Sequence, residues 1–255
     1  MLSPDSARRA EAAGYTNVRI FHEGMPAWKK AGNLVVSEPE SLKEFIGKDI
    51  SHVLVDLRPA KQAAAGHIQG AFSVPAESLA SAKERFPADK SAPIILYGEG
   101  IPAEAFRTVR GWGYKDTTLL NGGIASWQKI GGLLLQGEMP SSIVYVWKPR
   151  PGEVLIEDFK NYVEKKDPGV LILDVRDKDE AMNGMLRGAI NIPASEIQDR
   201  AKELPKDKLI VTHCVTGIRA ESAYEDLKEL GFKNIKFLNA VIQIDKDGKY
   251  EITKK

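Results

Sequence analysis

The chain contains one sequence pattern twice, at a constant spacing. Each copy has an apolar segment that ends in Asp-x-Arg, then a Gly-Ala-x-x-x-Pro turn, then a glycine followed by an aromatic residue. The first residues of these landmarks pair as Asp56 with Asp174, Gly70 with Gly188, and Gly113 with Gly231. The members of every pair are 118 positions apart (174 − 56). A pattern that recurs with one period predicts a repeated structural unit, and therefore two homologous domains.

In each copy, short apolar segments alternate with segments of helical character. For the second copy we predict strands at 170–175, 209–212 and 235–238, and helices at 156–165, 195–204 and 219–230. Such alternation predicts a parallel sheet covered by helices on both faces, because parallel strands need crossover connections. The expected fold class is therefore α/β, with two domains of this kind.

A partial third copy opens the chain. Residues 14–21 parallel 231–237, and the glycine and tryptophan of 24–28 parallel those of 123–127. The predicted domains are a partial repeat at 1–33, a full repeat at 34–149 and a full repeat at 150–255. The partial repeat lacks the first two-thirds of the pattern, as a shortened chain or a misplaced start codon would explain. Its apolar side chains need a surface to cover them, so we expect it to dock on the middle repeat or pair with a second copy, which leaves a homodimer open.

Composition and charge argue against several classes of protein. Apolar residues make up 43% of the 255 residues and charged residues 28%, as in soluble globular proteins. A net charge of +1 provides no basic excess for binding nucleic acid or an anionic membrane. No apolar run approaches the roughly 18 residues of a membrane span, and the N-terminus lacks the features of a secretory signal. We therefore expect a cytoplasmic protein, or a periplasmic one if the native N-terminus is longer.

The one segment with a clear chemical reading surrounds the single cysteine, Cys214. It follows a predicted strand and begins a six-residue loop that contains Gly217 and ends at Arg219. Ligands bind beyond the carboxyl ends of parallel strands, and a helix start there offers free N–H groups to an anion. The thiolate is the nucleophilic form of cysteine, and a helix N-terminus stabilises it by at most about 2 kcal/mol. Arg219 and direct N–H bonds to sulfur are expected to supply the rest of its activation.

A lone cysteine also excludes an internal disulfide, a Cys-x-x-Cys redox pair and a thiolate-rich metal site. We expect neither a metal nor a cofactor.

Together, the cysteine loop, the Asp-x-Arg strand ends, the Gly-Ala-x-x-x-Pro turns and the glycine–aromatic pairs resemble the rhodanese superfamily. The resemblance implies two doubly wound α/β domains and transfer of sulfane sulfur through a cysteine persulfide. In such proteins the sulfur comes from thiosulfate, a mercapto acid or a carrier protein and goes to a nucleophilic acceptor. Cys214 would be the catalytic nucleophile, and the sulfur-binding loop would be formed by Val215, Thr216, Gly217, Ile218 and Arg219. The Arg219 side chain would also help to hold an anionic donor.

The two repeats depart from this pattern in different ways. The middle repeat has no cysteine in its corresponding loop, at 98–102, which predicts an inactive domain. In the cysteine-containing repeat, the Gly-His-Ile of 66–68 becomes Gly-Met-Leu at 184–186. The Gly-Gly-Ile of 122–124 with its following tryptophan is also lost, at 239–243. These losses leave the substrate, and to a lesser degree the activity itself, open.

Three further residues are candidates to support the site: Asp174, Arg176 and Arg187. The pair Asp174 and Arg176 also occurs in the cysteine-free repeat, which favours a buried ion pair over a role in the chemistry. Arg187 either adds positive potential at the mouth of the site or is a solvated arginine. His213 precedes Cys214 on a strand and points to the opposite face, so we expect a structural role for it.

The sequence thus predicts a thiosulfate sulfurtransferase-like enzyme with Cys214 as its persulfide-forming residue. Its expected partners are a small anionic sulfur donor and a thiol acceptor or sulfur-carrier protein. The alternative is a non-catalytic rhodanese-fold binding or scaffold protein, in which the middle repeat docks a partner.

Overall fold

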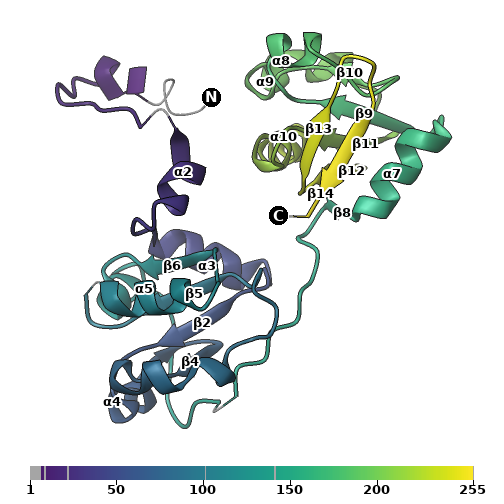
Figure 1. Cartoon of the computed structure of the whole chain (residues 1–255). Helices are drawn as coiled ribbons and strands as arrows, with labels where there is room; N and C mark the ends of the chain where they lie inside the picture. The colour runs from purple at the N-terminus through teal and green to yellow at the C-terminus, as the bar shows by residue number, and fades with distance from the viewer. Residues whose placement is uncertain (1–6, 9, 22, 101, 141, 255) are drawn as a thin grey trace. The chain divides into compact units, whose positions relative to one another are not determined.

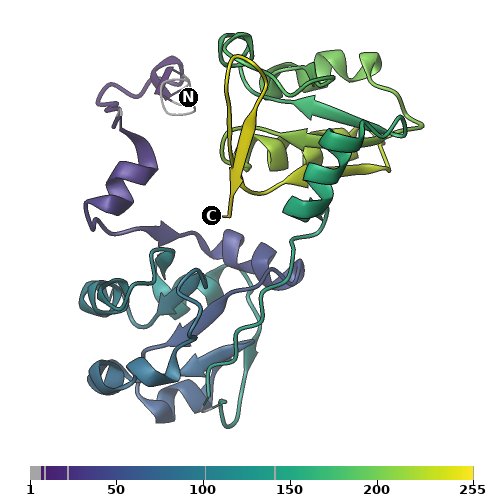
Figure 2. The same cartoon turned by 45° about the vertical axis from the view of Figure 1, so that its right-hand side comes forward.

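The computed structural model describes residues 7–8, 10–21, 23–100, 102–140 and 142–254. The chain forms two compact units, Met1–Trp147 and Lys148–Lys255, and each is described by itself. Figure 1 labels the helices and strands of both, and Figure 2 shows them after a turn of 45°. Among the described residues, no helix combines the length and the apolar character needed to cross a membrane.

The first unit is built on a five-stranded parallel sheet with the strand order β1-β6-β5-β2-β4. Its strands are β1 (Val36–Ser37), β2 (Val53–Asp56), β4 (Ala71–Ser73), β5 (Ile94–Tyr97) and β6 (Thr117–Leu120). The central strands β2 and β5 are buried along their whole length, as apolar runs without alternation predict. A short antiparallel pair, β3 (His67–Ile68) and β7 (Leu134–Leu135), lies outside this sheet.

Helices connect these strands and cover the sheet. They are α3 (Pro39–Gly47), α4 (Ala60–Ala65), α5 (Ala103–Gly111) and α6 (Gly123–Lys129), with 3₁₀ turns η1 (Ala76–Ser81) and η2 (Lys83–Arg85), whereas α2 (Gly24–Lys30) precedes the first strand. Successive residues of β2 belong to different core clusters: Val53 and Val55 lie with Phe106, and Leu54 lies with Trp127. Both faces of the sheet are therefore covered, as predicted for an α/β domain.

The second unit repeats this plan. Its sheet is parallel and has the order β10-β9-β11-β12-β8. The strands are β8 (Glu153–Val154), β9 (Val170–Asp174), β10 (Ile190–Asn191), β11 (Leu209–His213) and β12 (Ile235–Leu238). The helical elements are α7 (Ile156–Lys165), α8 (Lys178–Met182), η3 (Ala194–Glu196), α9 (Ile197–Arg200), η4 (Ala201–Glu203) and α10 (Ile218–Glu229). The predicted α/β fold class with two parallel-sheet domains is confirmed.

The register of the two sheets gives a residue-by-residue correspondence between the units. In the first unit Tyr97 lies opposite Asp56, and in the second His213 lies opposite Asp174. Since both aspartates occupy the same place in the repeat, His213 corresponds to Tyr97. The residue that follows the strand is Gly98 in the first unit and Cys214 in the second, so these two positions correspond.

The units differ after their last central strand. The first continues into helix α6, whereas the second continues into an antiparallel hairpin of β13 (Val241–Ile244) and β14 (Tyr250–Thr253). The hairpin, yellow in Figure 2, supplies four side chains to the core on the face covered by α7: Ile242, Ile244, Tyr250 and Ile252. The loss of the Gly-Gly-Ile and tryptophan signature at 239–243 therefore reflects a change from helix to hairpin.

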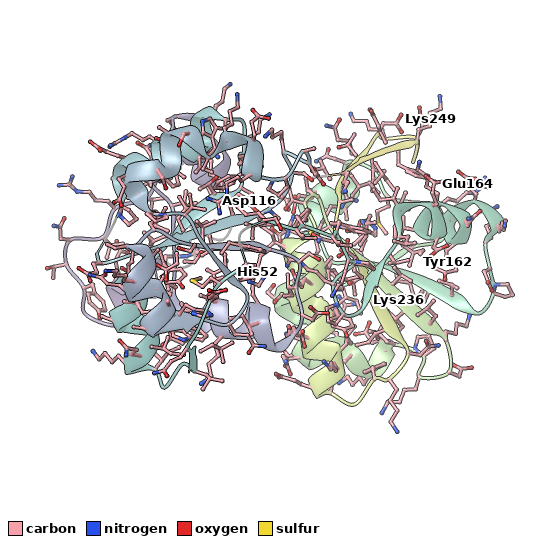
Figure 3. The ribbon with its side chains drawn as sticks, turned by 90° about the horizontal axis from the view of Figure 1, so that it is seen from below. His52, Asp116, Tyr162, Glu164, Lys236 and Lys249 are labelled. Atoms are coloured by element: carbon pink, nitrogen blue, oxygen red, sulfur yellow. The ribbon has the colours of Figure 1, made fainter. Side chains whose placement is uncertain are left out.

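Helix α7 and the hairpin are joined by a polar contact as well. Figure 3 labels Tyr162 and Glu164 on α7 and Lys249 just before β14. The hydroxyl of Tyr250 donates to Oε1 of Glu164 at 3.3 Å. The turn of the hairpin lies close to Gly184, where an added Cβ would be 2.0 Å from the carbonyl oxygen of Asp245. Gly184 also has φ +143°, so this position accepts only glycine without strain.

The N-terminal segment meets the first unit through polar contacts. Lys29 forms an ion pair with Asp116, labelled in Figure 3, at 2.8 Å. The backbone carbonyl of Lys29 accepts a hydrogen bond from Arg110 at 2.5 Å. The side chains of Tyr15 and Phe21 remain 69% and 44% exposed. The described part of this segment is therefore attached at α2, while its apolar residues are not fully covered.

Candidate active site

Cys214 directly follows β11 and lies four residues before Ile218, the first residue of α10. This is the carboxyl end of a parallel strand, where the sequence predicted a ligand to bind. Gly217 is the N-cap residue of α10 and has φ +85°, in the left-handed region. The helix begins at Ile218, so the irregular loop is shorter than the six residues expected and Arg219 belongs to the first helical turn. The side chain of Cys214 is only 1% exposed.

One backbone donor reaches the sulfur in this structure. The N–H of Gly217 donates to Sγ of Cys214 at 3.2 Å. The left-handed conformation of Gly217 turns this N–H inward, and an added Cβ there would lie 3.0 Å from the Cα of Asn239 and from the carbonyl oxygen of Leu238. A side chain at position 217 would therefore disturb the conformation of the loop. A donor at this place is suited to stabilise a thiolate.

The hairpin that replaces α6 also holds the cysteine loop. The carbonyl of Val215 accepts a hydrogen bond from the N–H of Ile242 at 2.9 Å. A similar contact in the first unit joins the N–H of Ile124, which corresponds to Ile242, to the carbonyl of Gly98, one position earlier in the loop, at 3.2 Å. The second unit thus keeps the support of this loop although the supporting element is a strand. Thr216 and Ile218 are exposed, while Val215 is half-buried.

His213 faces away from Cys214, as the alternation along β11 predicted. Its ring contacts that of Phe159 edge-on, with ring centroids 5.9 Å apart, whereas Cys214 belongs to the core cluster on the other face. Burial lowers the pKa of His213 to about 4, against an ordinary value of 6.5. Among the described residues, neither ring nitrogen has a hydrogen-bond partner. A neutral imidazole on the opposite face is not placed to accept the proton of the Cys214 thiol.

Asp174 and Arg176 form a buried ion pair rather than a contact to sulfur. Arg176 Nη2 lies 2.5 Å from Oδ2 of Asp174, and it also donates to the carbonyl of Gly184 at 2.6 Å. The cysteine-free unit has the same pair in Asp56 and Arg58, again with a separation of 2.5 Å. The ion pair expected from the repeated sequence is present in both units, so it is a feature of the fold.

Arg219 is held by two carboxylates that sequence reasoning did not identify. Its Nη1 and Nη2 donate to Oε2 and Oε1 of Glu180 at 2.6 and 2.9 Å. Nη1 also donates to Oδ2 of Asp177 at 3.2 Å. The hydrogen bonds that Arg219 donates to Glu180 are the main cause that raises the pKa of Arg219, and the charge of a Cys214 thiolate adds to it. Arg219 therefore acts on Cys214 through space while its donors are engaged elsewhere.

A sequence signal for these carboxylates existed. Asp177 and Glu180 have the spacing of a capping box, and the N–H of Asp177 donates to Oε2 of Glu180 at 3.0 Å at the start of α8. Arg187, by contrast, is exposed and makes neither a hydrogen bond nor an ion pair with any described residue. The structure thus brings Arg219 to the cysteine loop and leaves Arg187 without a contact there.

The corresponding loop of the first unit packs tightly against the start of α6. Gly123 has φ +58°, and an added Cβ there would lie 2.1 Å from the carbonyl oxygen of Gly98. The hydroxyl of Tyr97, in the place of His213, accepts a hydrogen bond from the N–H of Ile68 at 3.2 Å. This unit offers no thiol at the strand end. Within the described residues of the chain, no group of three or more His, Cys, Asp or Glu side chains is arranged to hold a metal ion.

Comparison with known proteins identifies the repeated unit. The Rhodanese-like domain family matches residues 38–130 and 155–241, together more than half of the chain. The chain is 36% identical over 83 residues to the putative sulfur carrier protein YrkF of Bacillus subtilis, covering 32% of this chain and 44% of that protein. It is 30% identical over 73 residues to the thiosulfate sulfurtransferase GlpE of Coxiella burnetii, covering 29% of this chain and 66% of that protein.

Among solved structures, the crystal structure of SseA from Escherichia coli, described as a 3-mercaptopyruvate sulfotransferase with the rhodanese fold, is similar at 22% identity with a TM-score of 0.38. That match covers 81% of this chain and 98% of SseA. The chain spans less than two thirds of the length of the two curated relatives named above. The family match, in two segments that follow the two sheets, is the finding that decides the assignment. The chain belongs to the rhodanese-like family and contains two rhodanese-like domains.

Proposed function

We propose that the chain is a sulfurtransferase in which Cys214 carries sulfane sulfur as a persulfide. The observation that carries this proposal is the hydrogen bond from the Gly217 N–H to Sγ of Cys214 at the start of α10, within a rhodanese-like domain. The domain boundaries that we propose are a partial repeat at 1–33, an inactive domain at 34–149 and the cysteine-containing domain at 150–255. No cofactor and no metal are needed for this chemistry.

The proposed reaction has two steps. In the first, the Cys214 thiolate attacks the sulfane sulfur of a donor, a new S–S bond forms, and the electron pair of the broken bond leaves with the donor. In the second, an acceptor nucleophile attacks the outer sulfur of the persulfide, and the Cys214 thiolate is released. His213 is buried, neutral and on the other face, so the first proton is lost to solvent. The Gly217 N–H and the nearby charge of Arg219 stabilise the resulting thiolate.

The donor and acceptor classes are proposed from the relatives and from this site. One relative is named a thiosulfate sulfurtransferase and another a putative sulfur carrier protein, which supports a thiosulfate-like donor or a protein persulfide. A thiol or a cyanide-like nucleophile would accept the sulfur. The five residues Val215 to Arg219 would form the binding loop for the transferred sulfur, and Asp174 and Arg176 would support it by fixing the end of β9.

A binding or scaffold role is the second candidate, and one observation favours it. Cys214 is almost fully buried, and the first unit shows that this fold persists without a thiol at the strand end. In this case the chain would bind a partner through a rhodanese-like surface without turnover.

A thiosulfate:cyanide assay on the wild type and on Cys214→Ser separates the two candidates. The sulfurtransferase proposal expects thiocyanate from the wild type and none above the uncatalysed rate from Cys214→Ser. The matching control is the thermal unfolding of both proteins, since Ser is nearly isosteric with Cys and the folds should agree. A wild type that releases no thiocyanate with thiosulfate or with a persulfide donor would favour the scaffold.

A further inference from the structure

Carboxylates surround the one arginine of the cysteine loop. Glu180 accepts hydrogen bonds from Nη1 and Nη2 of Arg219, at 2.6 and 2.9 Å. Asp177 accepts one from Nη1 at 3.2 Å. A bidentate arginine–carboxylate pair of this kind is geometrically specific and stronger than a bond between neutral groups. An anionic donor that is to bind Arg219 must therefore compete with Glu180.

Glu180 is also fixed without Arg219. Its Oε2 accepts the N–H of Asp177, so the carboxylate is built into the first turn of α8. The side chains of Glu180 and Arg219 are only 33% and 18% exposed, which limits screening by solvent. Hydrogen bonds from Arg219 lower the pKa of Glu180, so this carboxylate is ionised at neutral pH. The Glu180 carboxylate therefore offsets the positive charge of Arg219, the one arginine of the cysteine loop.

We propose that Glu180 determines the donor preference of the Cys214 site, so that a sulfane donor with one negative charge is preferred to dianionic thiosulfate. This inference rests on the sulfurtransferase function proposed above. The attraction of an arginine for the donor scales with the charge of the donor, so the attraction that is lost when Glu180 engages Arg219 is twice as large for a dianion as for a monoanion at the same place. Glu180 is thus a specificity residue that acts through Arg219, and it does not itself touch the transferred sulfur.

Two donors of matched chemistry isolate this effect. Thiosulfate and the methanethiosulfonate anion, CH₃SO₂S⁻, each carry a sulfane sulfur on a sulfonyl sulfur and differ by one charge. With either donor the Cys214 thiolate bonds to the sulfane sulfur, and the electron pair of the broken S–S bond leaves on sulfite or on methanesulfinate. Charge is conserved in both reactions, and neither needs an oxidant or a reductant.

The experiment compares kcat/KM for the two donors, with cyanide as acceptor and at low ionic strength, in the wild type and in Glu180→Gln. Glutamine keeps an oxygen that accepts the N–H of Asp177, so the change removes charge rather than the helix cap. The ratio of thiosulfate to methanethiosulfonate should rise on the order of fivefold, chiefly through a lower KM for thiosulfate. Asp177→Asn, which leaves the Glu180 pair intact, should raise the ratio less.

The control is Glu203→Gln. Glu203 pairs with Arg200 in the same unit and has no contact with the cysteine loop, so this variant should keep the wild-type ratio. An equal fall of kcat/KM for both donors in Glu180→Gln, with an unchanged ratio, would show a merely structural role and overturn the inference. If Glu180→Gln does not fold, an unchanged ratio in Asp177→Asn overturns it as well.

A second readout is independent of sulfur transfer. Iodoacetate and iodoacetamide alkylate the same thiol and differ by one charge, so the ratio of their rates at Cys214 reports the local field. That ratio should rise in Glu180→Gln and stay constant in Glu203→Gln. Unchanged alkylation ratios would contradict the inference even if transfer occurs. A shifted alkylation ratio with no transfer from either donor would instead contradict the proposed function.

Discussion

Replacing His213 with phenylalanine should make the second unit less sensitive to acid. The imidazole is fully buried against Phe159, and burial lowers its pKa to about 4 from 6.5. In the unfolded chain the ring binds a proton below pH 6.5, whereas in the folded chain it stays neutral down to about pH 4. Stability is therefore lost as the pH falls through this window, because the unfolded state binds more protons. A shift of two to three pKa units corresponds to about 3 kcal/mol.

Phenylalanine carries no such group, and its ring would lie beside Phe159 as the imidazole does. The difference in unfolding free energy between His213→Phe and the wild type should therefore grow by about 3 kcal/mol between pH 7 and pH 4. At pH 7 the variant should already be at least as stable, since it removes two buried ring nitrogens that have no hydrogen-bond partner among the described residues. His213→Tyr should behave similarly, because Tyr97 occupies the same register in the first unit.

The two units can be followed separately in one protein. The chain has one cysteine and four tryptophans, and the tryptophans at 28, 112, 127 and 147 all precede the second unit. Urea unfolding at several pH values, followed by labelling of Cys214 with a pyridyl disulfide that also reacts in mild acid, reports the second unit. Tryptophan fluorescence reports the first unit, which should respond equally in wild type and variant. A free-energy difference that stays constant from pH 7 to pH 4 would refute the account of His213.

Three further outcomes are expected. Gly184→Ala should lower the free energy of unfolding of the second unit in urea by at least about 2 kcal/mol, because its Cβ would meet the carbonyl of Asp245. In Gly188→Ala the added Cβ meets no atom within 4 Å, so the loss of stability should be smaller, and equal losses in the two variants would contradict this. Gly217→Ala should reduce sulfur transfer more than tenfold, while Gly231→Ala, at nearly the same φ but in open space, should retain it. A fragment of residues 148–255 should unfold in a single cooperative transition by circular dichroism, and a gradual loss of signal would show that it depends on the first unit.

Much of the fold follows from the sequence because its signals are local. The constant spacing of Asp56 and Asp174 gives the repeat, and the buried apolar runs before them give the central strands. Strand alternation alone places His213 and Cys214 on opposite faces. The cysteine loop was found because its parts, from Cys214 to the helix start, are consecutive in the chain.

The hairpin was missed because its signal is short. Residues 241–244 and 250–253 are each one four-residue strand, and no element was predicted after the strand at 235–238. An Asp-Gly pair at 247–248, typical of hairpin turns, was the available clue. The predicted helix at 195–204 is instead three short elements, η3, α9 and η4, although Ile197, Ala201 and Leu204 still reach the core.

The partners of Arg219 could not be read from the sequence for a different reason. Glu180 lies 39 positions before Arg219, and only the tertiary structure brings α8 to the start of α10. The predicted role of Arg219 in holding an anionic donor now depends on whether Glu180 releases it. Nothing local to the cysteine loop indicates this competition.

The most direct test of the account is the mass of the intact protein after exposure to a sulfane donor. The wild type is incubated with excess methanethiosulfonate or thiosulfate and desalted. Its mass is then measured by mass spectrometry under non-reducing conditions. The account predicts a gain of one sulfur atom on the peptide that contains Cys214, and its loss when cyanide or a thiol is added. A wild type that gains no sulfur from either donor, or a Cys214→Ser variant that gains as much, would contradict it.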